Sequence, residues 1–535
     1  MSQKKGQNYL HGAAILTAGV IVMKILGFLY KMPIGNIIGD DGYSMFLATY
    51  NVYNVFLTLS TAGLPIALAR LISEAHAENR PMQVRRTFRV AWWTFFAIGF
   101  VCSLVMALFP RFIAGEILHN PDAALSIRVM SPSVLLVCLV SAYRGYCQGF
   151  GDMIPTTVGQ VLEVLVKFAV GLALAWLFMS RGYGKPVGSA GAIFGVTAGS
   201  AAALAFMWLF KRRHYREEEI AEPDRPDSHA QILRRFLRIG IPIALGSSVL
   251  ALLNLVDSSL CMGRLQQAAG FSYGQAQVLY GVYGKAQTIF NLPAAIITPL
   301  TISVVPAITA AIVRREDDLA TKISEDSMRI AAVLSLPMGV GLAVLAKPIM
   351  GVIYPGSHAS GASLLALLGL ASIFVCMVLM ENAVLQATGH ELLPMISMIV
   401  GGVIKVVINF FLVARPNVNI YGAPIGTLAS YVVMAVMNFV FMCVMLDENP
   451  KLRHILVRPA VCTAVMAAFA WSVNGLAERF LPGGGRSHML LCILASMLAA
   501  IAIYLFMTVA LRTITKEDMK LIPGGEKLAK LLHMR

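Results

Sequence analysis

Residues 392–413 read LLPMISMIVGGVIKVVINFFLV, and Lys405 is the one charged residue in this run. The run is long enough to cross a bilayer as a helix, because about 20 apolar residues span the hydrocarbon core. An ammonium group there is costly unless it faces a cavity or a partner. Lys24, Lys167 and Lys285 lie inside other apolar runs. This pattern indicates a membrane protein with a polar interior, and it predicts a pathway for an anionic substrate.

The composition extends this reading to the whole chain. Of the 535 residues, 57% are hydrophobic and only 13% are charged, which excludes an ordinary soluble protein. We predict an all-α polytopic membrane protein with about 14 transmembrane helices. The apolar runs begin near Leu10, Tyr43, Phe88, Leu125, Pro155, Val187, Ile239, Gln275, Met328, Ser363, Leu392, Ile420, Ile455 and Met489.

The formal net charge of +15 is explained by membrane topology. With the N-terminus in the cytoplasm and one crossing per run, most Lys and Arg residues, Arg144 among them, fall on the cytoplasmic side. This asymmetry is the one that the positive-inside rule describes. The basic charge therefore gives no indication of a nucleic-acid partner, and both termini are predicted to be cytoplasmic.

The two halves of the chain repeat several features in the same order. Gln148 precedes Lys167 by 19 residues, and Gln386 precedes Lys405 by 19 residues. A Gly-Ala-x-x-Gly sequence follows each of these lysines. Repeats with an even number of crossings share one orientation, and in transporters the substrate site lies between such repeats. We therefore predict two pseudo-symmetric six-helix lobes plus two C-terminal helices.

Five segments follow from this organisation. They are the N-terminal lobe at residues 1–210, a cytoplasmic basic linker at 211–238, the C-terminal lobe at 239–448, two appended transmembrane helices at 449–511 and a basic cytoplasmic tail at 512–535.

The first helix offers two cations on one face. Lys24 and Lys31 are seven residues apart, which is about two helical turns. Two ammonium groups on one stripe suit a pyrophosphate, whereas Lys31 alone could also snorkel to the headgroups. Glu163 lies four residues before Lys167, the favourable order for an ion pair. Such a pair would either hold its helix in place or contact the substrate.

Two lysines in the second half complete the candidate substrate site. Lys405 has no acidic residue one turn away, which makes it the better candidate for an unpaired cationic site. Lys285 has Tyr280, Tyr283 and Gln287 as neighbours in sequence, which suits the wall of a water-filled cavity.

Residues 24–74 read KILGFLYKMPIGNIIGDDGYSMFLATYNVYNVFLTLSTAGLPIALARLISE. The KILGF motif, the Ile38-Gly39-Asp40 turn and the run LTLSTAGLPIALA resemble the opening of the stage V sporulation protein B family. These polysaccharide-biosynthesis-type flippases are allied to the bacterial lipid II flippases. They belong to the multidrug/oligosaccharidyl-lipid/polysaccharide exporter superfamily, and the resemblance covers nearly the whole chain.

The resemblance implies two six-helix lobes around a cavity that opens alternately to either side of the bacterial cytoplasmic membrane. It implies that an undecaprenyl-pyrophosphate-linked glycan, lipid II above all, moves from the inner to the outer leaflet. Another polysaccharide intermediate is the alternative cargo, and the role served would be in cell-wall growth, sporulation or capsule assembly. The expected partners are this lipid-linked oligosaccharide and membrane lipids, and the expected state is a monomer.

Lipid II flippases similar to this chain carry basic residues in the first, second and eighth helices. Lys24 falls on the first of these positions. The second, six residues on, is Tyr30, and Lys31 lies next to it. The basic pair of the second helix is replaced here by Leu57 and Thr58.

A cation site is predicted as well. Asp257 lies among amide and hydroxyl side chains, and such oxygens suit a hard cation. The resemblance implies sodium binding between the seventh, eleventh and twelfth helices, at Asp257, Asn409 and Thr427. A hydrogen-bonded helix contact is the alternative for Asp257. Glu381 and Asn382 are a second candidate, as a relay, so the coupling ion is either Na⁺ or H⁺.

Three other classes fit the sequence less well. A multidrug antiporter of the same superfamily would carry acidic residues for cationic drugs, whereas the intramembrane charges here are mostly basic. A glycosyltransferase would need catalytic acids or a large outer domain, and the outer loops are short. A scaffold without cargo would have no use for Lys24 and Lys405. Gly184-Lys185 continues to Pro186, so no Walker A sequence is present and no enzymatic activity is predicted.

Overall fold

The structure is a computed structural model that describes residues 2–61, 63–215, 224–446, 452–480, 486–511 and 513. The regular structure in these ranges is helical throughout, which confirms the predicted all-α class. Apart from Thr513, the predicted basic tail at residues 512–535 lies outside the described residues.

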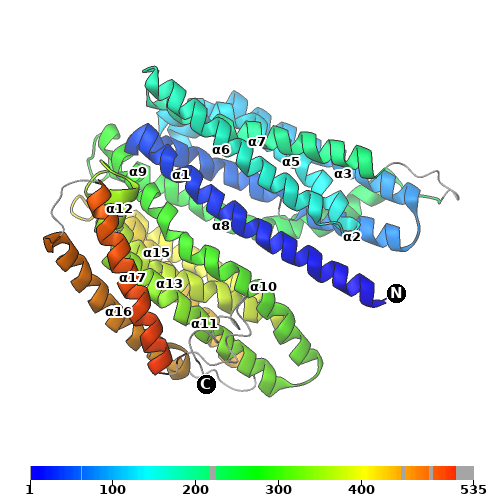
Figure 1. Cartoon of the computed structure of the whole chain (residues 1–535). Helices are drawn as coiled ribbons and strands as arrows, with labels where there is room; N and C mark the ends of the chain where they lie inside the picture. The colour runs from blue at the N-terminus through cyan, green and yellow to red at the C-terminus, as the bar shows by residue number, and fades with distance from the viewer. Residues whose placement is uncertain are drawn as a thin grey trace. The chain divides into compact units, whose positions relative to one another are not determined.

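The elements are shown in Figure 1. In chain order they are α1 Ser2–Thr61, α2 Leu64–Ala77, α3 Pro81–Leu108, α4 Pro110–Phe112, η1 Ile113–Ile117, η2 Pro121–Ala123, α5 Ala124–Gly149, α6 Ile154–Ser180, α7 Lys185–His214, α8 His229–Gln267, α9 Tyr273–Phe290, α10 Leu292–Val313, α11 Asp317–Val344, α12 Ala346–Ile353, α13 Ser360–Ala387, α14 Leu392–Leu412, η3 Asn419–Tyr421, α15 Gly422–Met445, α16 Leu452–Phe480 and α17 Arg486–Ala510.

Twelve helical stretches among the described residues are long and apolar enough to cross a membrane. The first of them, Val22–Ala77, has 56 residues. At 1.5 Å per residue it would be about 84 Å long, more than twice the ~30 Å hydrocarbon core. It therefore has room for the first two predicted crossings. α8, the predicted seventh crossing, is not among the twelve, and the count of 14 stays a prediction.

The chain divides into two compact units, Met1–Gly263 with Ser272–Gly281 and Arg264–Phe271 with Val282–Arg535. Most of α8 therefore packs in the first unit, although the C-terminal lobe was predicted to begin at residue 239. The predicted linker is partly helical, because α7 and α8 extend into it from its two ends. The lobe boundaries and their pseudo-symmetry stay predictions.

The last part of this linker is docked on the start of α3. The carboxylate of Asp224 accepts hydrogen bonds from the backbone N–H groups of Met82, at 2.6 Å, and Gln83, at 3.0 Å. A helix N-terminus leaves these donors without intrahelical partners, and its dipole favours a negative charge. Arg80 donates to the carbonyl oxygen of Arg225 at 2.8 Å. These contacts hold the linker against the first unit.

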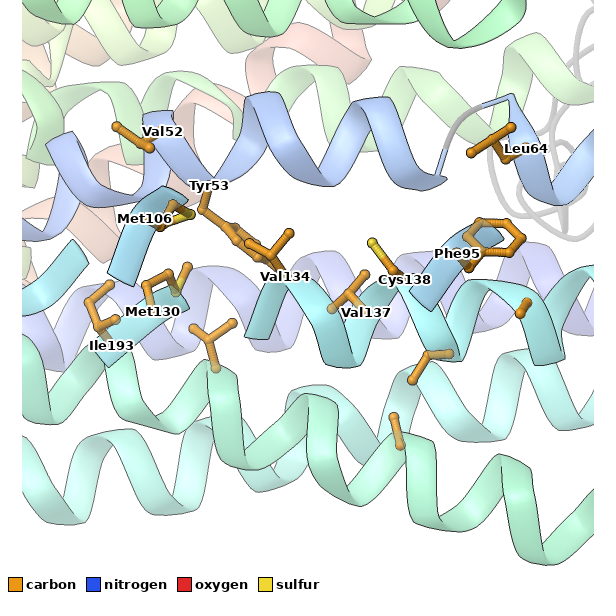
Figure 2. Packing of buried hydrophobic residues seen from close by; sticks show 14 of the residues in the cluster. Val52, Tyr53, Leu64, Phe95, Met106, Met130, Val134, Val137, Cys138 and Ile193 are labelled. Carbon is orange, nitrogen blue, oxygen red and sulfur yellow. The ribbon is translucent and has the colours of Figure 1, made fainter. Parts of the chain in front are cut away.

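α1, α3 and α5 share the hydrophobic core of the first unit. Tyr53 of α1 and Val134 of α5 are buried in one cluster, which Figure 2 shows from close by. Gly99 lets α3 approach α5, because a side chain there would meet Cβ and Sγ of Cys138 at 2.8 and 3.0 Å. The close approach removes apolar surface from water and lipid on both helices.

α1 consists of two helices that meet at Gly39, where φ is 77° and ψ is −173°. This left-handed φ is open to glycine and strained for other residues. Asp41, just after the break, forms an ion pair with Lys185 at the start of α7 at 2.5 Å. The Ile38-Gly39-Asp40 motif of the sequence therefore separates the first two helices.

We expect Gly39→Ala to lower the free energy of unfolding by about 1–2 kcal/mol, because an L side chain is strained at this φ. Gly27→Ala is the matched control in the same element. A Cβ at Gly27 meets no atom within 4 Å, and Ala favours a helix over Gly by about 1 kcal/mol. Thermal unfolding of the purified protein in detergent measures the stability of both variants. Equal melting temperatures of Gly39→Ala and Gly27→Ala would contradict the strain assigned to Gly39.

α13 lies at the centre of the second unit, where α10, α11, α12 and α15 pack against it. The two predicted appended helices, α16 and α17, pair with each other, and α16 packs on α11 (Figure 1). The hydroxyl of Tyr504 in α17 donates to the carbonyl oxygen of Val333 in α11 at 2.6 Å. The appended helices are therefore an integral part of this unit.

The Gly-Ala-x-x-Gly sequences make a matching contact in each unit. A Cβ at Gly195 would meet the carbonyl oxygen of Lys167 at 2.6 Å, and one at Gly426 would meet that of Lys405 at 3.3 Å. The glycine thus lets α7 pack closely on α6, and α15 on α14, at the level of the lysine. This correspondence supports the predicted duplication.

Candidate functional site

Two of the predicted lysines meet inside the first unit, although they are far apart in sequence. Nζ of Lys31 lies 5.8 Å, and Nζ of Lys167 lies 5.9 Å, from the ring centroid of Tyr50. Lys167 also lies 5.2 Å from the ring centroid of Tyr30. Ammonium groups are attracted to the faces of such rings. The two charges also repel each other, so the arrangement favours an anion that can neutralise both.

The rings are held in place by the fold of α1 and by α7. Tyr30 lies before the break at Gly39, and Phe46 and Tyr50 lie after it, with 6.2 Å between the centroids of Tyr30 and Phe46. The Phe46 and Tyr50 centroids are 4.8 Å apart. The Tyr30 hydroxyl donates to the carbonyl oxygen of Ala192 at 2.6 Å. Packing and one buried hydrogen bond therefore hold the aromatic rings of Tyr30, Phe46 and Tyr50 in place next to the lysines.

The expected ion pair between Glu163 and Lys167 is not formed. The carboxylate of Glu163 instead accepts from Arg144 at 2.8 Å and from the Ser200 hydroxyl at 3.3 Å. In the described part of the chain, no carboxylate forms an ion pair with Lys31 or Lys167. The positive charge of the two lysines is thus not neutralised by a nearby acid.

Arg144 has a partner that was not predicted from the sequence. It lies in the last turns of α5, forms an ion pair with Glu163 and is only 13% exposed at its side chain. Its location on the cytoplasmic side stays a prediction. A signal for the pair was present in the sequence. Arg144 lies seven residues before Gly151 and Glu163 ten residues after Met153, so the two side chains are on the facing helices of one hairpin, where a long arginine side chain can reach a carboxylate.

The other three lysines lie elsewhere. Lys24 is exposed on α1, two turns before Lys31. Lys285 in α9 is 3% exposed, with Nζ 5.2 Å from the ring centroid of Tyr354. Lys405 in α14 is half-buried. Lys285 and Lys405 belong to the second unit, so a site that is shared by all five lysines stays a prediction.

The three predicted sodium ligands are divided between the units. Asp257 is buried in the first unit, where it accepts a weak hydrogen bond from Sγ of Cys261 at 3.8 Å. Asn409 and Thr427 are buried in the second unit, and the Thr427 hydroxyl donates to the carbonyl oxygen of Ala423 at 2.9 Å. The sodium site at these residues stays a prediction.

Solved structures of transporters share this fold. The lipid II flippase MurJ in an inward closed conformation matches with a TM-score of 0.68 at 12% identity, over 93% of this chain and 100% of that one. An inward-facing multidrug resistance MATE family transporter of the MOP superfamily matches with a TM-score of 0.66 at 15% identity, over 81% and 98%. The chain therefore shares the fold of these two membrane proteins.

Relatives in sequence define the family. Residues 9–312 match the model of the polysaccharide biosynthesis protein family, and the chain belongs to this family. Stage V sporulation protein B of Bacillus subtilis (strain 168) is 24% identical over 529 residues, 97% of this chain and 98% of that protein. The lipid II flippase MurJ of the same organism is 23% identical over 477 residues, 86% of each chain. The resemblance seen in residues 24–74 is confirmed.

Proposed function

We propose that the protein is a flippase for an undecaprenyl-pyrophosphate-linked glycan, with lipid II as the leading cargo. The glycan would pass from the inner to the outer leaflet of the bacterial cytoplasmic membrane by alternating access of two lobes. Both termini would lie in the cytoplasm, and the protein would act as a monomer. A different polyprenyl-linked polysaccharide intermediate is the alternative cargo.

The pair formed by Lys31 and Lys167 at Tyr50 is the observation that carries this proposal. A diphosphate presents several anionic oxygens, and an ammonium group donates up to three hydrogen bonds. Each charge-assisted hydrogen bond contributes about 1.5–3 kcal/mol. Two ammonium groups close enough to repel each other are stabilised by one ligand that carries two or more negative charges.

A multidrug antiporter is the second candidate, and the similarity of fold to a MATE transporter favours it. A cationic drug would require an acidic partner in the cavity. Glu163 is the acid nearest to the lysine pair in sequence, and its carboxylate already bonds to Arg144. The charges of the first unit therefore suit an anionic cargo better than a cationic one.

Complementation in cells depleted of their own lipid II flippase tests the proposal. We expect the wild-type protein to restore growth and to restore labelling of lipid II by a probe of the outer leaflet. Failure of both readouts, with normal expression and membrane insertion, would exclude lipid II as the cargo. The same experiment with cells that accumulate another polyprenyl-linked glycan then tests the alternative.

A further inference from the structure

The first unit contains an apolar groove with a volume of about 490 Å³. Small-molecule sites in proteins have volumes of about 300–1,000 Å³. Only apolar side chains line the groove, among them Val52 and Phe56 of α1, Val105 of α3, Phe112 of α4, Ile117 of η1 and Leu255 of α8. Water has no hydrogen-bond partner against such a wall, whereas a hydrocarbon chain fits it.

The groove lies at the level of one bilayer leaflet. Arg89 is exposed near the start of α3, and Phe109 follows the last residue of this helix, 20 residues further on. At 1.5 Å per residue the two positions are about 30 Å apart, which is the thickness of the hydrocarbon core. Phe109 and Phe112 are 55% and 58% exposed, so the mouth of the groove faces the acyl chains. In the predicted topology this is the outer leaflet.

Two side chains of opposite charge accompany the mouth of the groove. Arg111 directly precedes Phe112, and Glu116 directly precedes Ile117. Both are exposed, and neither forms an ion pair within the residues that the structure describes. They are five residues apart, and Glu116 belongs to a π-helix, in which residues five apart are neighbours. The mouth therefore offers one positive and one negative charge.

We propose that this groove binds a phospholipid whose zwitterionic headgroup carries an ammonium group, such as phosphatidylethanolamine. One acyl chain fills the groove, Arg111 binds the phosphate and Glu116 binds the ammonium group. A guanidinium matches the geometry of a phosphate, and a carboxylate accepts charge-assisted hydrogen bonds from an ammonium group. An anionic lipid would satisfy Arg111 and leave Glu116 next to a like charge. The site does not depend on the proposed flippase function.

The bound chain completes the packing of the first unit. The groove wall combines α1, α3 and α8, so a chain inside it contacts three helices that are distant in sequence. An empty apolar space destabilises a folded protein in proportion to its volume. The lipid therefore acts as a stabilising component of the native unit rather than as a cargo.

The test is the thermal stability of the purified full-length protein after its lipids have been exchanged for detergent. Dioleoyl phosphatidylethanolamine is added back in the same detergent, because a ligand of the native state raises the melting temperature with its concentration. Dioleoyl phosphatidylglycerol has the same acyl chains and a net negative charge, and it is the matched control lipid. We expect the phosphatidylethanolamine to act at a concentration about tenfold lower, the effect of one charge-assisted hydrogen bond.

Variants separate the chain from the headgroup. Val105→Trp fills the groove and should lose the response to both lipids, and Ile117→Trp is a second filling variant. Val101→Trp adds the same bulk one turn earlier on α3, outside the groove lining, and should keep the response. Val101 and Val105 are 58% and 39% exposed, so both variants are expected to fold.

The two charged residues are tested in the same way. Glu116→Gln should remove the preference for phosphatidylethanolamine over phosphatidylglycerol. Arg111→Gln should weaken the apparent affinity for both lipids about tenfold, because both carry the phosphate that loses its partner.

Three results would overturn the proposal. Filling variants that respond to lipid as the wild type does would show that no chain occupies the groove. A response to phosphatidylglycerol at the same or a lower concentration, unchanged in Glu116→Gln, would contradict the assigned headgroup contacts. A wild type that responds to neither lipid would exclude a stabilising lipid altogether. Because no readout uses transport, the complementation experiment remains an independent test of the flippase function.

Discussion

Replacing Lys31 and Lys167 together with alanine is expected to abolish transport of the lipid-linked diphosphate in a protein that still folds. Each ammonium group supplies a charge-assisted hydrogen bond of about 1.5–3 kcal/mol. Loss of both removes about 3–6 kcal/mol, which corresponds to about 10²- to 10⁴-fold at 1.4 kcal/mol per tenfold. Folding should not suffer, because the change removes two like charges that repel each other.

Complementation and outer-leaflet labelling of lipid II measure this effect. The control variant, Lys322→Ala with Lys347→Ala, removes the same charge from two exposed positions of the second unit and should keep activity. The double variant Lys31→Arg with Lys167→Arg keeps both charges and should keep part of the transport activity. Normal activity of the Lys31 and Lys167 double alanine variant would reject the assigned site.

Glu163→Ala is expected to cause the largest loss of stability, about 3 kcal/mol. The substitution leaves the Arg144 guanidinium in the helix bundle without its carboxylate, and removal of one partner of a buried ion pair costs about 3–5 kcal/mol. The side chains of the pair are 13% and 20% exposed, so we expect the lower end of this range. Thermal unfolding in detergent reports the loss.

The double variant Arg144→Leu with Glu163→Leu distinguishes an unpaired charge from a simple loss of packing. Replacement of both partners of a buried pair by apolar residues is often neutral. We therefore expect the double variant to recover most of the stability that Glu163→Ala loses. A double variant as unstable as Glu163→Ala would show that the ion pair is not the cause.

The helices of this protein could be predicted from local sequence. A run such as residues 392–413 has one stable form in a bilayer, because hydrocarbon offers no partner for backbone N–H and C=O groups outside a helix. The break in α1 was also visible, as the Ile38-Gly39-Asp40 turn. The division of the chain into its two compact units was not visible in the sequence. α8 follows the linker along the chain, and yet it belongs mostly to the first unit.

The candidate site was predicted only in part. Lys167 stood out because it is a charge in an apolar run, and Lys31 because it lies seven residues after Lys24. Their meeting at Tyr50 was not predictable, since it requires α1 to fold at Gly39 and α6 to pack against both of its parts. The pairing of Arg144 with Glu163 was not predicted either, because it depends on how α5 and α6 pack against each other.

The sequence by itself determined that this chain is a helical membrane protein with lysines in its interior, because apolar length and the energetic cost of a buried charge are local properties. Only the tertiary structure decided the partner of each charge. It paired Glu163 with Arg144 rather than with Lys167, and it brought Asn438 of α15 to Asn382 of α13. Ion pairs and ligand clusters form between helices, and which faces meet depends on the packing of the whole unit.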